Sequence, residues 1–219
     1  MNAATGLFVL LMMLGGGRAA VAQDRGGELA LTTTDVGVRI LVDPSISSKR
    51  LVKSLELEAE TIWAPYGIRL SWLDPRTVPS LQPSIDVHLD RKGGEPERIE
   101  WRTVLGNVMV GPDDRGPHPI HLSFNATWEM LKTRSAPLRL GISGVVPDLL
   151  MARALGRVLA HEIGHVLIGE KYHDRDGLMR AHFTTDQLAE FDRAPFRVTC
   201  STMARLRAGL RGLTEGAAR

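Results

Sequence analysis

The sequence has almost no cysteine, since Cys200 is the only one among 219 residues. A single thiol can form no disulfide within the chain, and it excludes a structural zinc site built from several thiolates. We expect Cys200 to pack as a small hydrophobic side chain; the alternative is a disulfide to another chain. Without internal disulfides the fold depends on its core, and 43% hydrophobic residues are enough to form one.

A strong charge of either sign is also lacking. The 27 lysines and arginines nearly balance the 25 aspartates and glutamates, which leaves a net charge of +2. The arginines are spread along the chain, and no basic block contains interleaved aromatic residues. Neither nucleic acid nor a membrane surface is therefore expected as a partner. No internal repeat is present, and the length suits one compact domain, or one domain with extensions.

No hydrophobic run is long enough to span a bilayer. The longest, Leu7–Leu14, is followed by glycines at 15–17 and by Ala20-Val21-Ala22, which supplies the small residues that signal peptidase requires. Residues 1–6 contain no lysine or arginine, so the amino group alone provides the positive charge of this region. We predict a signal peptide over 1–22, a short leader over 23–34, and a secreted or periplasmic protein without a membrane anchor in its mature form.

Hydrophobic periodicity predicts the regular elements of the rest of the chain. Alternation with a period of two predicts strands at 36–42, 68–73, 85–89, 105–110 and 120–124. A helical period predicts helices at 46–63, with Ser45 or Ser47 as the cap, and at 147–169, 184–192 and 200–213, with a helical turn at 128–131. The last helix is basic and amphipathic, and its apolar stripe is expected to be a packing face.

The most informative pattern is His161-Glu162-Ile163-Gly164-His165. Residues four apart lie on the same face of a helix, so His161 and His165 are placed to hold one zinc ion. Glu162 is close enough to reach a zinc-bound water and to act as a general base. The alternative is two histidines and a carboxylate on an ordinary solvated helix, but the surrounding residues are apolar, which favours the zinc site.

This motif and the order of the elements resemble the metzincin zinc metallopeptidases, and the matrixin branch most, over about residues 35–195. The resemblance implies an α+β fold with a twisted, mostly parallel five-stranded sheet. A long helix would follow the first strand, and the zinc helix, a methionine turn and a C-terminal helix would complete it. The catalytic domain would span 35–199 and the C-terminal helix 200–219. The strand at 105–110 would be the sheet edge, where this family binds extended peptide.

The resemblance also implies roles for residues after the zinc helix. Gly169 would let the chain turn back, His173 would be the third zinc ligand, and Met179 would lie in the methionine turn beneath the metal. The spacing differs from the family pattern, because Gly169 and His173 follow His165 by four and eight residues rather than three and six. The competing third ligands are Asp174, Asp176 and, in the style of gluzincins, Glu190; Met179 has the alternative role of filling space in the core.

The remaining candidates have weaker support. His88, His118 and His182 are expected to be solvated, His121 could line the cleft, and Tyr172 could add a hydrogen bond. Asn125-Ala126-Thr127 is a glycosylation sequon only in a source that glycosylates.

The sequence therefore predicts an exported zinc endopeptidase with peptide or protein substrates. Its ligands would be His161, His165 and His173, and its base Glu162. The alternatives are an exported zinc-binding scaffold without turnover, a gluzincin-type peptidase that uses Glu190, and a metal-free domain.

Overall fold

The structure is a computed structural model that describes residues 33–76, 84–91, 104–108, 119–133 and 144–217. The predicted signal peptide (1–22), most of the leader (23–34) and His118 lie outside the described residues. Residues 32–219 form one compact unit, which includes the helix that the sequence set apart at 200–219. Within the described part of the chain, no helix combines the length and the apolar character that a membrane crossing needs.

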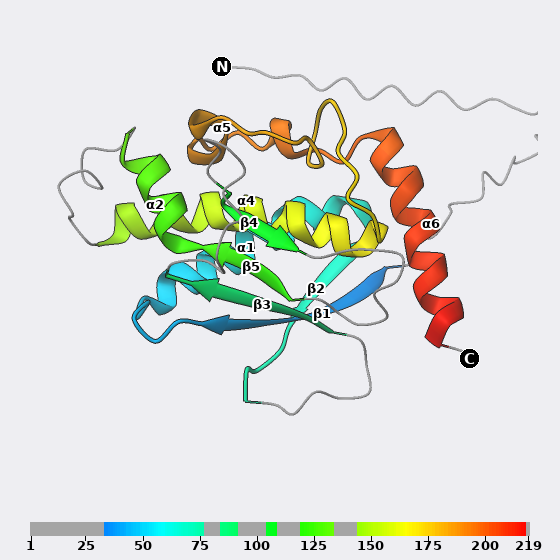
Figure 1. The fold of residues 1–219 in the computed structure, drawn as a ribbon, viewed down its shortest axis with the longest axis horizontal. Helices are drawn as coiled ribbons and strands as arrows, with labels where there is room; N and C mark the ends of the chain where they lie inside the picture. The colour runs from blue at the N-terminus through cyan, green and yellow to red at the C-terminus, as the bar shows by residue number, and fades with distance from the viewer. Residues whose placement is uncertain (1–32, 77–83, 92–103, 109–118, 134–143, 218–219) are drawn as a thin grey trace, which may run out of the picture. The chain divides into compact units, whose positions relative to one another are not determined.

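A five-stranded sheet has the strand order β2-β1-β3-β5-β4 (Figure 1). Strands β1, β2, β3 and β5 are parallel, and β4 runs antiparallel to β5 at one edge. This confirms an α+β fold with a mostly parallel sheet and the prediction that the fourth strand forms an edge. The strands are β1 (Thr34–Val42), β2 (Ile68–Trp72), β3 (Ser84–Asp90), β4 (Gly106–Val108) and β5 (Ile120–Ser123).

Alternation along the strands separates the two faces of the sheet. In β3, Ile85, Val87 and Leu89 are buried, while the intervening polar residues lie on the other face. On that polar face Arg39 of β1 donates to both carboxylate oxygens of Asp86, at 2.7 to 3.0 Å. The apolar face must therefore be covered by helices.

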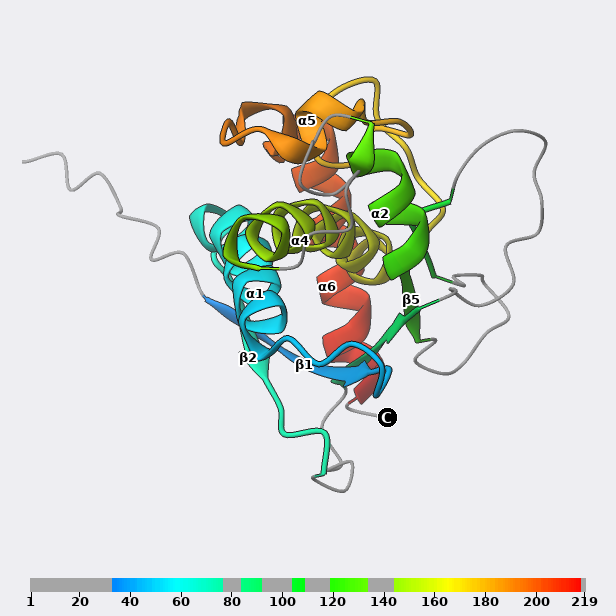
Figure 2. The same cartoon turned by 90° about the vertical axis from the view of Figure 1, so that its left-hand side faces the viewer.

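Helices α1 (Lys49–Trp63) and α4 (Val145–Ile168) pack against each other on the apolar face of the sheet (Figures 1 and 2). The side chain of Ser48 accepts from the backbone N–H of Leu51 and caps α1, so the predicted caps Ser45 and Ser47 were wrong by one to three residues. As predicted, α4 ends at Gly169, whose left-handed backbone (φ 74°) suits glycine. Helix α6 (Cys200–Ala217) packs against α4.

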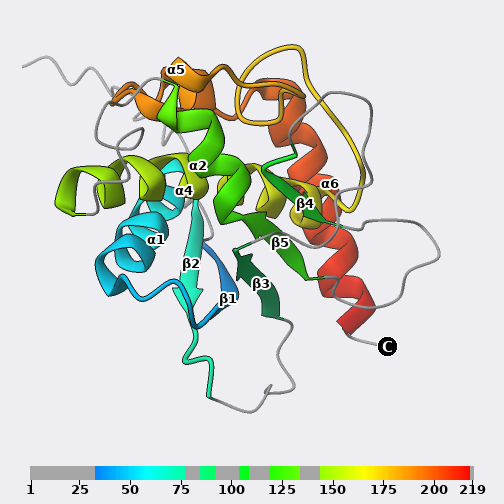
Figure 3. The same cartoon turned by 60° about the vertical axis from the view of Figure 1, so that its left-hand side comes forward.

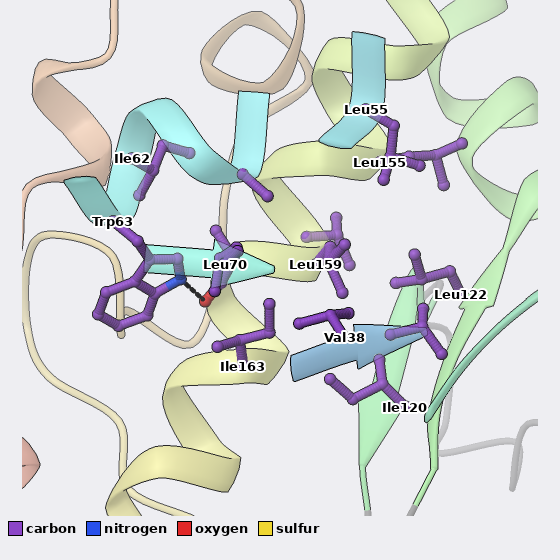
Figure 4. Packing of buried hydrophobic residues seen from close by; sticks show 14 of the residues in the cluster. Val38, Leu55, Ile62, Trp63, Leu70, Ile120, Leu122, Leu155, Leu159 and Ile163 are labelled. Carbon is purple, nitrogen blue, oxygen red and sulfur yellow. Dashed lines mark hydrogen bonds between the residues drawn. The ribbon is translucent and has the colours of Figure 1, made fainter. Parts of the chain in front are cut away.

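The core lies between these two helices and the sheet (Figure 4). Trp63 at the end of α1 is fully buried, and its indole N–H donates to the carbonyl of Ala160 in α4 at 3.2 Å. Leu155, Leu159 and Ile163 of α4 face the strands from the same helix that carries the histidines. This burial holds α4 rigidly against the sheet.

Three further sequence predictions differ from the structure. Helix α2 (Phe124–Lys132) is longer than the turn predicted at 128–131, because Ser123 caps it by accepting from the N–H of Ala126. Helix α5 (Thr185–Ala189) stops before the predicted end at 192, and Phe191 is 83% exposed. Cys200 is exposed at the start of α6, so the prediction that it packs as a small hydrophobe was wrong.

A buried arginine explains why α5 ends early. Arg157 of α4 has a fully buried side chain, and its Nη1 donates to the carbonyl of Gln187. Arg153 likewise donates to the carbonyl of Ala189. A longer α5 would use these carbonyls for its own ladder, so the arginines compete with its continuation. Sequence periodicity contains no information about this competition.

The same Arg157 side chain donates from Nε to Glu58 of α1 at 2.8 Å, and Arg193 donates to the other oxygen of Glu58 at 2.6 Å. We expect Arg157→Ala to lower the free energy of unfolding by about 3–5 kcal/mol, because it breaks a buried ion pair and leaves Glu58 with one partner. Urea unfolding measures the loss. Arg205→Ala, which removes an exposed pair with Glu170, should cost less than about 1 kcal/mol. Equal stability of the two variants would contradict the expectation.

Candidate metal centre

His161 and His165 lie one turn apart on α4, and their side chains are 9% and 6% exposed. Their rings are perpendicular, with centroids 4.7 Å apart. The helical spacing predicted from the sequence therefore places the two imidazoles together, in a part of the helix where every residue from Ala154 to His165 is buried.

Backbone carbonyls determine which ring nitrogens face each other. His161 Nδ1 lies 2.7 Å from the carbonyl oxygen of Leu178, and His165 Nδ1 lies 3.1 Å from that of Glu170. A carbonyl oxygen can only accept, so each Nδ1 carries the proton and donates it. Each Nε2 of the neutral ring then presents a lone pair.

The two Nε2 atoms are 3.0 Å apart, which would bring two lone pairs together with no proton between them. A cation between the nitrogens removes this repulsion. Tetrahedral zinc with Zn–N bonds of about 2.0–2.1 Å places its nitrogen ligands about 3.3 Å apart. The donor set and its spacing therefore fit a divalent metal.

His173 completes the group. Its ring centroid is 5.5 Å from that of His161 and 4.9 Å from that of His165. One ligand atom from each of the three histidines lies within 4.8 Å of the others, close enough for the three to bind one ion. His173 is exposed, so the group is open to solvent on its side. An open position is what a substrate or water would need.

The histidines are neutral at neutral pH in the absence of metal. Burial, with a smaller contribution from neighbouring His165, lowers the pKa of His161 to about 3. Burial also lowers the pKa of His165 to about 4 and lowers the pKa of His173. Neutral imidazole is the form that binds metal, so protons compete weakly for these sites.

Glu162, which follows His161 on α4, packs beside Gly106 of the edge strand β4. Its side chain is 6% exposed, and its Cγ is 3.2 Å from where a Cβ would stand on Gly106. The same added Cβ would be 2.6 Å from Val158, so only glycine lets β4 approach α4 this closely (Figure 3). Burial raises the pKa of Glu162 to about 8. A nearby dication would favour the ionised form and oppose this effect.

Met179 is fully buried against α4, in a turn where the N–H of Arg180 donates to the carbonyl of Gly177 at 3.2 Å. A Cβ on Gly164 would overlap Met179 Sδ, so the thioether lies directly against the α4 backbone between His161 and His165. These contacts are equally consistent with the alternative role, in which the Met179 side chain only fills space in the core. The neighbouring Leu178 acts directly on the site, because its backbone carbonyl accepts from His161 Nδ1 and orients that ring.

The competing third ligands are not brought to the histidines. Among the described residues, the group that could hold one ion contains neither Asp174, Asp176 nor Glu190. Asp174 instead accepts hydrogen bonds from three hydroxyl groups, which lower its pKa to about 2. Asp176 pairs with Arg197, and Glu190 is exposed at the end of α5.

The other candidates lie outside this group. His182 is exposed, and Tyr172 stacks under Arg205, whose guanidinium is 4.1 Å from the ring centroid. His121 stacks on His88 at 4.9 Å on the polar face of the sheet, so it does not line the metal centre. Asn125 is exposed in the first turn of α2. The sequence did not identify Leu178 and Glu170 as parts of the site. Both act through their backbone carbonyls, which every residue has, so no sequence pattern marks them.

This chain was compared with protein-family models, with curated proteins and with solved structures. No family model, no curated protein and no solved structure matches it.

Proposed function

We propose that this protein is a zinc-dependent endopeptidase of the metzincin type. One observation carries the proposal: three imidazoles lie close enough to bind one ion, and Glu162, the residue after His161 on α4, is buried beside an edge strand. This is the combination that hydrolysis of an extended peptide needs. In this interpretation Gly169, His173 and Met179 have the family roles of turn, third ligand and methionine turn.

His161, His165 and His173 would hold the zinc through nitrogen. A bound zinc lowers the pKa of its water to about 7 and polarises the scissile carbonyl. Glu162 would accept the proton of the attacking water and pass it to the leaving amine. Burial raises the pKa of Glu162 and a bound dication would lower it again, and a carboxylate whose pKa these opposing effects hold near neutrality can both take and release a proton.

The substrate would be a protein or peptide in extended conformation. Among the described strands β4 pairs only with β5, and the other edge of β4, which has no partner among them, would form hydrogen bonds to a peptide backbone. Glu162 packs beside Gly106 of β4, so a peptide added to this edge would pass near the base. With its predicted signal peptide, the enzyme would act in the secreted or periplasmic compartment.

The test uses the purified chain without residues 1–22. We expect elemental analysis to find about one zinc per chain and a mixed peptide library to be cleaved internally. A chelator should abolish cleavage, and added zinc should restore it. Zinc without any cleavage would favour the alternative of a non-catalytic zinc-binding domain. A chain with no zinc and no zinc affinity would contradict both.

A further inference from the structure

The segment 197–202, which leads into and begins α6, contacts the two loop positions that orient His161 and His173. The N–H of Leu178 donates to the carbonyl of Arg197 at 2.8 Å, while the carbonyl of Leu178 accepts from His161. Gly177 lies so close to Arg197 that an added Cβ would overlap its carbonyl oxygen. One ligand of the metal centre is thereby connected to the start of α6.

The second connection runs through Asp174, the residue after His173. Its Oδ2 accepts from the hydroxyls of Thr199 and Ser201, each at 2.5 Å, and from that of Thr202 at 3.3 Å. Its backbone N–H donates to the carbonyl of Met179 at 2.7 Å. Thr202 is fully buried at the base of α6, while Thr199 is half-buried and Ser201 is exposed, so the hydroxyl cluster runs from the packed base of the helix to its surface.

His173 needs such an anchor. It lies eight residues after His165, is exposed, and belongs to a stretch without helix or strand. A loop of this kind must lose conformational entropy when its side chain binds a metal, and this loss weakens binding unless the loop is already ordered. His161 and His165 have no such need, because the buried helix α4 holds them.

We infer that Asp174 is the positioning residue of the third ligand: through three hydroxyls it fixes the His173 loop to the start of α6, and it thereby sets the metal affinity of the site. This inference rests on the proposed zinc centre. Residues that orient a metal ligand typically change affinity by about 10–100-fold when they are removed, and we expect Asp174→Ala to weaken zinc binding by that factor.

The experiment measures zinc affinity by competition with a chromophoric chelator, and the visible spectrum after cobalt(II) substitution, without any substrate. Asp174→Asn retains an oxygen that accepts from the hydroxyls and should restore part of the affinity. Ser201→Ala removes one of the three hydroxyls and should cause a smaller loss in the same direction. The cobalt spectrum of Asp174→Ala should change, since it reports the geometry of the donors.

Asp176→Ala is the matched control, because Asp176 lies in the same loop but its exposed carboxylate pairs with the side chain of Arg197 and accepts from the N–H of Gly177, instead of accepting from the three hydroxyls. Its zinc affinity should fall by less than about fivefold. Circular dichroism of the metal-free proteins verifies that each variant is folded; if Asp174→Ala is unfolded, Asp174→Asn and Ser201→Ala decide the question.

The outcomes separate this inference from the proposed function. If the wild type binds zinc and the folded Asp174 and Ser201 variants bind it as tightly as Asp176→Ala does, the inference is overturned while the zinc centre stands. If the wild type binds no zinc, the proposed function fails and the inference fails with it. A graded loss from Ser201→Ala to Asp174→Ala, with an altered cobalt spectrum, supports the inference.

Discussion

Replacing Glu162 by glutamine is expected to reduce peptide hydrolysis by about 10²–10⁴-fold while the protein retains its zinc. Glutamine has nearly the same volume and fits beside Gly106, but its amide cannot accept the proton of the attacking water. The three imidazoles are unchanged, so the metal content should stay at the wild-type value. Cleavage of a fluorogenic peptide and elemental analysis of the same sample measure the two quantities.

Glu129→Gln is a suitable control for this substitution. Glu129 lies on α2 with an exposed side chain, and its pairing with Lys132 is remote from the histidines in sequence and on another element. Its hydrolysis rate should equal that of the wild type. Undiminished cleavage by Glu162→Gln would refute the assignment of the base, and loss of zinc from this variant would assign Glu162 to the metal instead.

The second large effect is expected for His173→Ala, which should weaken zinc binding by more than about 100-fold and abolish hydrolysis. Removing a residue that only orients a metal ligand typically lowers the metal affinity by about 10–100-fold, and removing the ligand itself should lower it further. Two nitrogens would remain, held 3.0 Å apart on α4, and they would bind zinc weakly. Titration of the metal-free variant with zinc against a competing chelator measures the change.

Glu190→Ala tests the alternative third ligand of the gluzincin style, and His182→Ala tests a nearby histidine that is expected to be solvated. Both residues are exposed and lie outside the group of three histidines, so each variant should bind zinc as the wild type does. Tight zinc binding by His173→Ala, together with its loss in either of the other two variants, would show that the third ligand had been assigned to the wrong residue.

The parts of the site that were predictable from the sequence are those that depend on local periodicity. His161 and His165 share a helix face because four residues make about one turn, whatever lies around them. Gly169 was predicted to end that helix, and it does so with a positive φ. The alternation in β3 likewise identified its buried face. Short-range geometry of the backbone is sufficient for each of these conclusions.

Other features needed contacts between distant parts of the chain. The sequence left His173, Asp174, Asp176 and Glu190 open as third ligands, because a loop's path depends on what it packs against. Tertiary structure decided among them by binding Asp174 to hydroxyls 25 to 28 residues away and leaving His173 beside the histidines of α4. The early end of α5, set by Arg157 from another helix, has the same kind of cause.

By itself, then, the sequence determined the helix that carries the two histidines, the order of strands and helices, and the carboxylate next to the first histidine. Only the tertiary structure decided which side chain joins the pair, which tautomer the histidines adopt, and how closely β4 approaches Glu162. The physical reason is the distance along the chain over which each kind of interaction acts. Helical and strand periodicity act over a few residues, whereas hydrogen bonds to carbonyls and hydroxyls join segments whose separation along the chain contains no information about their distance in space.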